Sequence, residues 1–390
     1  MKTSIKIANL LFALAFFAFL ATVGVASVTR PQQTDSIYEN RVLASYPTPT
    51  VESLATGRYF TKLETALCDH SAYRNAFLRL KTGLDLTLGR PVVNTVIPTD
   101  QGVYLPYQEY QKVDEELVAR RAQEITDDLA ALQAKVQAYG GTFLYVAVPD
   151  QGTYYAPLYL SYLNDGTQRI RAEKEAFLAQ AAQKGIPVLD IDALWAAQGF
   201  PDGYVYKEDH HWTFEGGYAA YGEILNALGM EQTVEFTVQE WQAPMIGSRV
   251  VRLCDLMQPL ERLRYATPKE WIPFTRYNWG NQTPAYENTI ALPLEGDPIR
   301  YGNYMGGDVD ETIIQTNRPQ LTDCLVVGDS FTNLVETLIY TEFDETRSLD
   351  FRYYNKMPMS QYIDGYQPQV VLVLRDVGSL LNNTGNGNLK

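Results

Sequence analysis

The chain has 390 residues, of which 46% are hydrophobic and 12% aromatic, enough to form one large core or two smaller ones. Its formal net charge of -14 repels phosphate backbones, and no basic cluster is visible, so nucleic-acid binding is not expected. Cys68, Cys254 and Cys324 have no CxxC spacing, which excludes a disulfide scaffold and a zinc ribbon while leaving room for a single disulfide.

The N-terminus predicts a membrane-spanning helix. Two lysines precede an uncharged run from Ile7 to Val28, which is close to the roughly 20 residues that cross a bilayer. The basic flank should stay in the cytoplasm, so the rest of the chain should lie on the extracytoplasmic side of the cell membrane. We therefore expect residues 1–30 to be an uncleaved single-pass anchor. The alternative is a signal peptide removed after Ala26, which would give a secreted protein.

The segment that follows predicts a spacer and then a folded domain. Residues 31–56 are rich in Pro, Thr, Ser and Gln, as spacers often are. Residues 57–390 are expected to form one α/β domain. Within it, apolar residues recur at alternating steps of four and three over 118–136, which predicts an amphipathic helix. The unbroken apolar run 143–148 is typical of a strand that is covered on both faces.

Helices and strands then alternate along the chain. The predicted elements are a helix over 168–183, a strand over 188–191, a helix over 213–228, a strand over 324–327, a helix over 333–340 and a last strand over 370–374. This alternation predicts a doubly wound, flavodoxin-like parallel sheet with helices on both faces. The pattern dissolves between about 231 and 320, where we expect an irregular insertion of short strands and loops on the rim of the sheet.

A serine follows the predicted strand over 324–327. In open α/β sheets such strand-to-helix turns lie at the carboxyl edge, where ligands bind. Gly328 permits a tight turn, and the amides after it can face an oxyanion, so Ser330 is a candidate nucleophile with Asp329 beside it. The alternative is that Ser330 only caps the helix that follows.

Two of the three histidines are adjacent, and one of them is paired with an aspartate. Asp209 and His211 are two positions apart, so in an extended or turn conformation the carboxylate can accept a hydrogen bond from the imidazole. That bond would leave Nε2 free to act as a general base. His210 would then point away as a supporting residue, and Trp212 would supply an apolar wall. The alternative is a surface loop or a buried histidine without a catalytic role.

Other residue patterns suggest weaker alternatives. A metal hydrolase could use Glu208, Asp209, His210, His211 and His70, but adjacent histidines rarely converge on one ion and no HExxH spacing exists, so neither a metal nor another cofactor is expected. Arg375, at the end of the last strand, could hold an acceptor or be an ordinary surface arginine. Trp241 and Tyr304, in the insertion, are candidates for contacts with a sugar, although such aromatics more often anchor irregular segments.

The segment Asp209-His210-His211-Trp212-Thr213 resembles the signature for which the bacterial DHHW protein family is named. It is also similar to the Asp-x-His-Trp-Thr motif of the alginate O-acetyltransferase (AlgX/AlgJ-like) proteins of the SGNH-hydrolase-like type. Further segments agree in order: Glu39-Asn40-Arg41, Gly57-Arg58-Tyr59-Phe60, Asp69-His70-Ser71-Ala72-Tyr73-Arg74, Ile246-Gly247-Ser248 and Val327-Gly328-Asp329-Ser330-Phe331. The resemblance spans most of the chain after the predicted anchor. It implies an SGNH-hydrolase-like domain in which an aspartate, a histidine and a serine move acetyl groups onto an exported polysaccharide.

Carried over by position, the resemblance implies that Asp209, His211 and Ser330 form a catalytic triad. We expect the amide of Ser330, with one from Gly247, Gly306 or Gly307, to stabilise the oxyanion. The expected activity is that of a serine-dependent O-acyltransferase or esterase on a cell-surface polysaccharide, with a membrane-bound O-acyltransferase supplying the acetyl groups. The alternative is a non-catalytic glycan-binding or scaffold partner of such an acyltransferase, which predicts triad atoms that are too far apart.

Overall fold

The structure is a computed structural model that describes residues 2–107, 112–163, 166–278, 284–286, 288–382 and 389. It divides the chain into two compact units, Met1–Asn94 with Val250–Gln258 and Thr95–Arg249 with Pro259–Lys390. A division into compact units does not test which segments fold independently. The expected limits of anchor, spacer and domain (1–30, 31–56 and 57–390) therefore stay a prediction.

The first unit begins with a long apolar helix. Helix α1 spans Lys2–Thr29, and its stretch Lys6–Ser27 has a mean hydropathy of 2.3 and the length needed to cross a membrane. This finding fits either a single-pass anchor or a signal sequence. The elements that follow are β1 (Asp35–Ser36), β2 (Arg41–Val42), α2 (Val51–Ala55), α3 (Arg58–Asp69) and α4 (Arg74–Thr87). The segment expected to be a spacer thus contains a short strand pair and a one-turn helix.

A buried carboxylate joins β2 to α3 in this unit. Asp69 accepts two hydrogen bonds from the guanidinium of Arg41, and it also accepts one from the N–H of Ala44. The Arg41 contact outweighs the effect of burial and holds the pKa of Asp69 well below its ordinary value.

All three cysteines are free thiols.

The second unit is built on an eight-stranded sheet with the order β10-β9-β11-β13-β12-β14-β5-β6. Strands β13, β12, β14, β5 and β6 are parallel, and β11, β9 and β10 continue the sheet antiparallel. The bounds are β5 (Thr142–Val148), β6 (Val188–Asp190), β9 (Thr275–Asn278), β10 (Pro284–Tyr286), β11 (Glu311–Gln315), β12 (Cys324–Gly328), β13 (Glu345–Asp350) and β14 (Val370–Asp376). The predicted parallel sheet is confirmed, and the insertion lengthens it by three strands.

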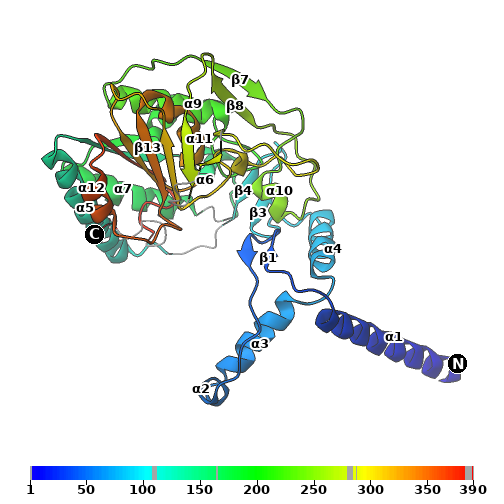
Figure 1. The fold of residues 1–390 in the computed structure, drawn as a ribbon. Helices are drawn as coiled ribbons and strands as arrows, with labels where there is room; N and C mark the ends of the chain where they lie inside the picture. The colour runs from blue at the N-terminus through cyan, green and yellow to red at the C-terminus, as the bar shows by residue number, and fades with distance from the viewer. Residues whose placement is uncertain are drawn as a thin grey trace. The chain divides into compact units, whose positions relative to one another are not determined.

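Helices cover both faces of this sheet, as predicted. Helices α5 (Glu115–Ala138), α7 (Thr167–Gln183) and α12 (Met359–Tyr366) lie on one face, and α9 (Phe214–Ala227) and α11 (Thr332–Ile339) lie on the other (Figure 1). The remaining elements are β3 (Val96–Pro98), β4 (Tyr104–Pro106), α6 (Gln151–Tyr154), α8 (Ile191–Ala197), β7 (Phe236–Glu240), α10 (Ser248–Arg252), β8 (Arg264–Pro268) and the 3-10 turns η1 (Ala156–Leu158), η2 (Tyr301–Asn303) and η3 (Tyr340–Glu342).

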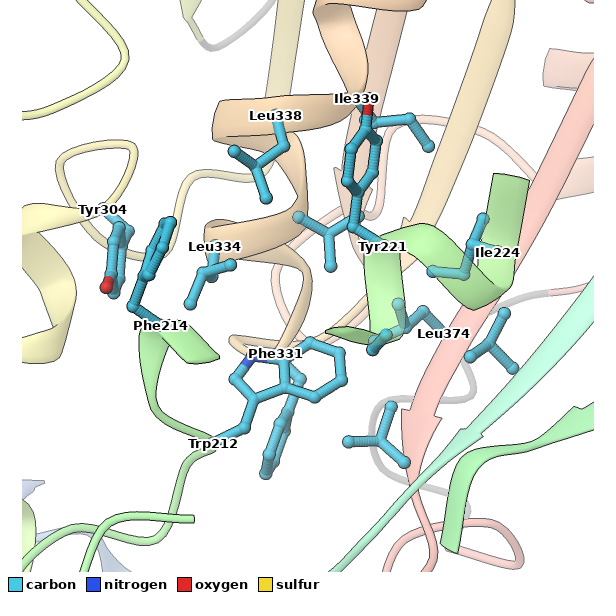
Figure 2. Packing of buried hydrophobic residues seen from close by; sticks show 14 of the residues in the cluster. Trp212, Phe214, Tyr221, Ile224, Tyr304, Phe331, Leu334, Leu338, Ile339 and Leu374 are labelled. Atoms are coloured by element: carbon cyan, nitrogen blue, oxygen red, sulfur yellow. The ribbon is translucent and has the colours of Figure 1, made fainter. Parts of the chain in front are cut away.

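The two covered faces explain why the central strands have no polar alternation. In β5, Leu144 and Val146 pack into the core on the α9 and α11 side, whereas Phe143 and Tyr145 pack into the core under α5 and α7. Successive side chains of a strand point to opposite faces, so each must be apolar when both faces are covered. Figure 2 shows the first of these cores, where Leu334 of α11 lies near the aromatic side chains of the α9 segment. Burying each such side chain contributes about 1.5–3 kcal/mol.

Candidate active site

The turn between β12 and α11 places a serine at the carboxyl edge of the sheet. A Cβ on Gly328 would lie 2.2 Å from the carbonyl oxygen of Leu374 on β14, so only glycine permits this close approach. Asp329 then closes the turn, because its Oδ1 accepts the N–H of Phe331 at 3.1 Å. The residue that caps α11 is Phe331, without a side-chain hydrogen bond. Ser330 is therefore not a simple helix cap, and its hydroxyl is available for another partner.

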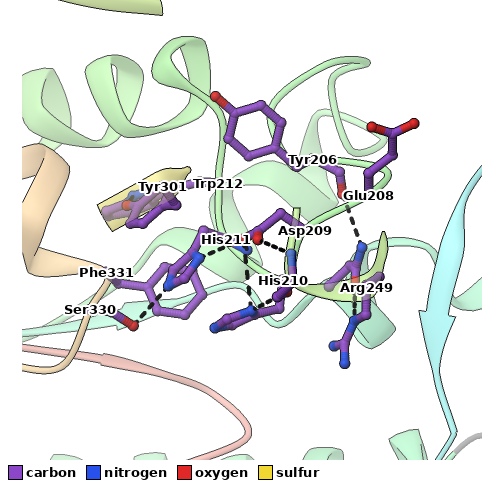
Figure 3. A network of polar contacts seen from close by, with 12 residues as sticks. Tyr206, Glu208, Asp209, His210, His211, Trp212, Arg249, Tyr301, Ser330 and Phe331 are labelled. Carbon is purple, nitrogen blue, oxygen red and sulfur yellow. Dashed lines mark hydrogen bonds and ion pairs between the residues drawn. The ribbon is translucent and has the colours of Figure 1, made fainter. Parts of the chain in front are cut away.

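That partner is His211. Ser330 Oγ lies 2.7 Å from His211 Nε2, and His211 Nδ1 lies 2.6 Å from Asp209 Oδ1 (Figure 3). The three residues are nearly enclosed, with exposed fractions of 9%, 5% and 3% in that order. The other carboxylate oxygen of Asp209 accepts the backbone N–H of Ser248 at 2.6 Å. The structure thus brings Ser330 into contact with a histidine that lies 119 positions before it in the sequence.

Electrostatics determine which nitrogen of His211 carries the proton. Burial alone would raise the pKa of Asp209, but the His211 and His210 rings and the hydrogen bonds to the carboxylate hold that pKa well below its ordinary value. Asp209 is therefore a carboxylate at neutral pH and can only accept hydrogen bonds. It follows that Nδ1 of His211 carries the proton, and that the lone pair of Nε2 faces the serine hydroxyl.

Aromatic rings fix the plane of the imidazole. The ring of Tyr301 stacks on His211 at 3.7 Å with an interplanar angle of 2°, and Phe331 lies 4.9 Å away on a tilted plane. Trp212 is 1% exposed and donates its indole N–H to the Tyr301 hydroxyl at 3.0 Å. The ring that stacks on the histidine is thus Tyr301, and Trp212 holds Tyr301 in place. Tyr301 itself was missed, because it lies in the irregular insertion where no motif or periodicity marks it.

Segment 246–248 supports the loop that carries the aspartate and the histidine. A Cβ on Gly247 would lie 2.2 Å from the carbonyl oxygen of Glu208, so this glycine allows the two backbones to touch. The hydroxyl of Ser248 lies 2.8 Å from His210 Nδ1. His210 stacks beside His211 at 3.8 Å with a side chain that is 42% exposed, so it does not point away as expected. Ser248 belongs to one of the segments that match the family, but its contacts with His210 and Asp209 were not predicted.

Two glutamates clamp the same loop from its other side. The carboxylate of Glu261 accepts the backbone N–H of Lys207 at 2.9 Å and of Glu208 at 2.8 Å. In return, the carboxylate of Glu208 accepts the N–H of Leu260 at 3.0 Å. Burial raises the pKa of Glu261 to about 7 and also raises that of Glu208. Segments 207–208 and 260–261 are thus held together by two carboxyl groups, and the one of Glu261 titrates near neutral pH.

Gly307, Tyr304 and Trp241 make contacts within the protein. Gly307 uses its N–H on the carbonyl of Tyr304 at 3.1 Å, so that amide already has an acceptor, and Gly306 precedes it in the same turn with a φ of +76°. Tyr304 is 0% exposed and bonds to the carbonyl of Arg264, which buries it in the core away from any open surface. Trp241 is partly buried and packs on Tyr265. These placements give no support to substrate contacts by Tyr304.

Arg375 is likewise inside the protein. It is 2% exposed, and its Nε lies 3.3 Å from Asp329 Oδ2. Burial raises the pKa of Asp329, and the positive charge of Arg375 opposes that rise. The structure therefore places Arg375 behind the nucleophile turn, where it faces Asp329 instead of solvent, contrary to the two roles considered from the sequence.

The histidine cluster has the ligand atoms of a metal site, but most of these atoms are engaged in hydrogen bonds. Asp209, His210 and His211 each offer a ligand atom, and these atoms lie within 4.8 Å of one another. Two of the donors are bonded to each other, since His211 Nδ1 meets Asp209 Oδ1, and His210 Nδ1 meets Ser248 Oγ. Glu208 is bonded to backbone amides, and His70 Nε2 lies 2.8 Å from the carbonyl oxygen of Ala44. The arrangement suits a hydrogen-bonded relay better than a metal ligand set.

Comparisons with known proteins agree with this architecture. The family model of the SGNH hydrolase-like domain of the acetyltransferase AlgX matches residues 104–277, which contain Asp209 and His211 but not Ser330. Bacillus cereus PatB1, solved with a sulfonyl adduct, is similar with a TM-score of 0.58 at 18% identity, over 73% of this chain and 95% of that one. A DHHW family protein from Eubacterium siraeum is similar with a TM-score of 0.56 at 20% identity, over 76% and 95%. No curated protein matches the sequence.

These findings confirm the resemblance seen in the sequence and the fold that it implied. The family model covers the segment with the Asp-x-His pair, and the structural similarity covers 73% to 76% of this chain. The chain therefore carries an SGNH hydrolase-like α/β domain, similar to that of the acetyltransferase AlgX.

Proposed function

We propose that this protein is an extracytoplasmic, serine-dependent O-acyltransferase or esterase that acts on a cell-surface polysaccharide through an acyl-serine intermediate. The observation that carries the proposal is the continuous chain of hydrogen bonds from Ser330 through His211 to Asp209, with contacts of 2.7 and 2.6 Å. Such a chain activates a hydroxyl for attack on an acyl carbon. The match to a domain named for an acetyltransferase supports the reaction class.

In the proposed first step, Ser330 Oγ attacks the carbonyl carbon of the acyl donor while His211 Nε2 takes the hydroxyl proton. The negative charge of Asp209 stabilises the imidazolium that results. His211 then returns the proton to the leaving oxygen, and the bond between that oxygen and the acyl carbon breaks. In the second half, a sugar hydroxyl or water gives its proton to the same nitrogen and attacks the acyl-serine, which releases Ser330 with its proton restored.

The turn also supplies a donor for the oxyanion. The N–H of Phe331 is already used by Asp329, whereas within the described part of the chain no acceptor is recorded for the N–H of Ser330. An amide that follows a strand and precedes a helix in this way can face the charge that develops on the acyl oxygen. We assign the N–H of Ser330 as one oxyanion donor. Since Gly307 bonds to Tyr304, that amide is a poorer second candidate than the sequence suggested.

The location and partners of the protein complete the proposal. Helix α1 would anchor the chain by residues 1–30, with 31–56 as the connection and the catalytic domain on the extracytoplasmic side. Acyl groups would come from a membrane-bound O-acyltransferase and go to an exported polysaccharide. The apolar helix and the family match support this arrangement. The experiment below examines which donor and acceptor the protein uses.

The test is mass spectrometry of the purified full-length protein after incubation with an activated acetyl ester. We expect an acetyl group on the peptide that contains Ser330 in the wild type, and none there in Ser330→Ala. Adding oligosaccharides should discharge the adduct onto sugar if the protein is a transferase, and onto water if it is an esterase. An unmodified Ser330 peptide, together with equal ester turnover by wild type and Ser330→Ala, would overturn the proposal in favour of a non-catalytic binding protein.

A further inference from the structure

Helix α4 in the first unit carries its apolar side chains on the outside. Phe77, Leu80, Leu84 and Leu88 are 41%, 61%, 55% and 71% exposed, although Leu88 is the C-cap residue. Their spacing of three and four places them in one stripe along the helix. The residues buried on this helix are Thr82 and Asp85, which are polar. In a water-soluble helix the apolar stripe faces the protein, so α4 has the reverse arrangement.

Hydrogen bonds fix the polar face of α4 against the rest of its unit. Arg79 donates to the carbonyl oxygen of Cys254 at 2.5 Å, and Thr82 Oγ1 accepts from the side chain of Asn94 at 2.8 Å. These partners leave the helix little freedom to rotate its apolar stripe inward. The fold therefore keeps the apolar stripe exposed. An exposed apolar surface of this kind marks a contact with a partner.

The apolar stripe is continuous with the candidate membrane span. Phe77, at one end of the stripe, packs edge-on against Phe19 of α1 with ring centroids 6.3 Å apart. Two further contacts bind α4 and the residues before it to the end of α1: Ser27 Oγ accepts the N–H of Ala72 at 2.8 Å, and Arg30 stacks on Tyr73. Phe19 lies about two helical turns before Ser27, or roughly 12 Å along the axis of α1.

The position of Phe19 along α1 indicates what covers the apolar stripe of α4. If Ser27 lies at the surface of the bilayer, a side chain that touches Phe19 is at the level of the lipid tails, since the hydrocarbon core is about 30 Å thick. Lys81 and Arg90, with side chains 60% and 62% exposed, share one carboxylate, that of Asp85, and so leave a net positive charge beside the stripe. Cations beside an apolar stripe are typical of helices that lie in a membrane interface. A lipid surface thus meets both the apolar stripe and its basic border.

We propose that α4 is a second membrane-contacting element, which seats Phe77, Leu80, Leu84 and Leu88 in the lipid beside a retained α1. The proposal does not depend on the catalytic role of Ser330. It implies that α1 is an anchor and not a removed signal peptide, because removal would take away the Phe19 contact.

The test measures lipid contact in the full chain. Leu80→Cys and Leu84→Cys are each made on a Cys68→Ser background, so that the introduced cysteine is the exposed one while Cys254 and Cys324 stay buried. Each protein is spin-labelled and placed in liposomes of phosphatidylethanolamine and phosphatidylglycerol. Accessibility to oxygen, which concentrates in lipid, is compared with accessibility to a water-soluble nickel chelate. The matched control is Glu124→Cys on α5, whose side chain is 65% exposed in the other unit.

We expect the oxygen-to-nickel accessibility ratio at Leu80 and Leu84 to exceed that at Glu124 several-fold. Labels that are as open to nickel as the control would overturn the proposal. Labels that are shielded from both probes would overturn it as well, because a second copy or another protein would then cover the stripe. Circular dichroism of each variant checks that the exposed substitutions leave the fold intact.

Discussion

The two halves of the candidate site are positioned by different forces. The nucleophile turn is set by backbone packing, since Gly328 lets the end of β12 approach the carbonyl of Leu374 just before Ser330 and the start of α11. The loop with Asp209 and His211 has no regular structure, and buried carboxylates that accept backbone N–H groups hold it instead. Packing at Gly328 is insensitive to pH, whereas the buried carboxyl groups are not, and the turn contains one of them, Asp329, against three in and around the loop. A change in packing should therefore affect the turn most, and a change in pH should affect the loop most.

The largest effect is expected where the halves meet. Ser330→Ala removes the hydroxyl 2.7 Å from His211 Nε2 and should lower kcat/KM for an acetyl ester by about 10³-fold or more. Steady-state kinetics of wild type and variant measure this directly. Thermal unfolding serves as the control, because deletion of one oxygen from a site that is 9% exposed should leave the midpoint nearly unchanged. Retention of wild-type kinetics would contradict the assignment of the nucleophile.

The packing half can be broken at its glycine. Gly328→Ala should destabilise the fold by about 3 kcal/mol or more, because the new Cβ would lie 2.2 Å from a backbone oxygen that cannot move freely. Gly222→Ala, in α9, is the matched control: nothing lies within 4 Å of its Cβ, and alanine favours a helix. Thermal unfolding should separate the two variants clearly. Equal midpoints would show that the β12–β14 approach is not what fixes the turn.

The loop half can be tested through pH. The pKa of Glu261 is raised to about 7 by burial, from an ordinary value of 4.5. Between these values the folded protein binds a proton that the unfolded chain does not, so stability from this group falls as pH rises. Relative to Glu261→Gln, which does not titrate, wild type should lose about 1–3 kcal/mol between about pH 5 and about pH 8.

The measurement compares thermal unfolding midpoints of the two proteins across this range. Only the difference in slope is informative, because the amide of Gln also changes the hydrogen bonds to Lys207 and Glu208. A constant difference between the two curves, independent of pH, would mean that Glu261 keeps an ordinary pKa in the folded protein.

Local patterns were sufficient to predict the regular half of this fold. The strands over 143–148, 324–327 and 370–374 and the helix over 118–136 are confirmed within a few residues, since apolar periodicity reports which faces are covered. The Asp-x-His spacing and the serine after a strand made these residues candidates, and the family resemblance was needed to propose that the three side chains meet. Parallel strands end at a common edge, so the topology itself brings the end of β12 toward the loop beside it.

The remaining contacts depend on distant segments that no local pattern links. Tyr301 stacks on His211 from an irregular segment some ninety positions away, and the carboxylate of Glu261 accepts the N–H of Lys207 from 54 positions away. Strands β9 to β11 are short and interrupted by Pro, Asn and Gly, so their pairing is decided by the edge of β13 and not by their own periodicity. The prediction for Arg375 was based on its position at the end of a strand. The sequence cannot show that this side chain turns inward to face Asp329.

The smallest effect is expected at the ring that sequence reasoning missed. Tyr301→Phe keeps the ring that stacks on His211 at 3.7 Å but removes the acceptor for the indole N–H of Trp212, which is 1% exposed. A buried donor without an acceptor costs about 1–3 kcal/mol, so the unfolding midpoint should fall while the imidazole stays in place. We therefore expect a loss of stability with a less than tenfold change in kcat/KM. Tyr301→Ala removes the stacking ring as well and should lower kcat/KM further, since His211 would no longer be held in its plane. If Tyr301→Phe lowered activity as much as Tyr301→Ala, the hydroxyl and not the ring would be the part of Tyr301 that positions the base.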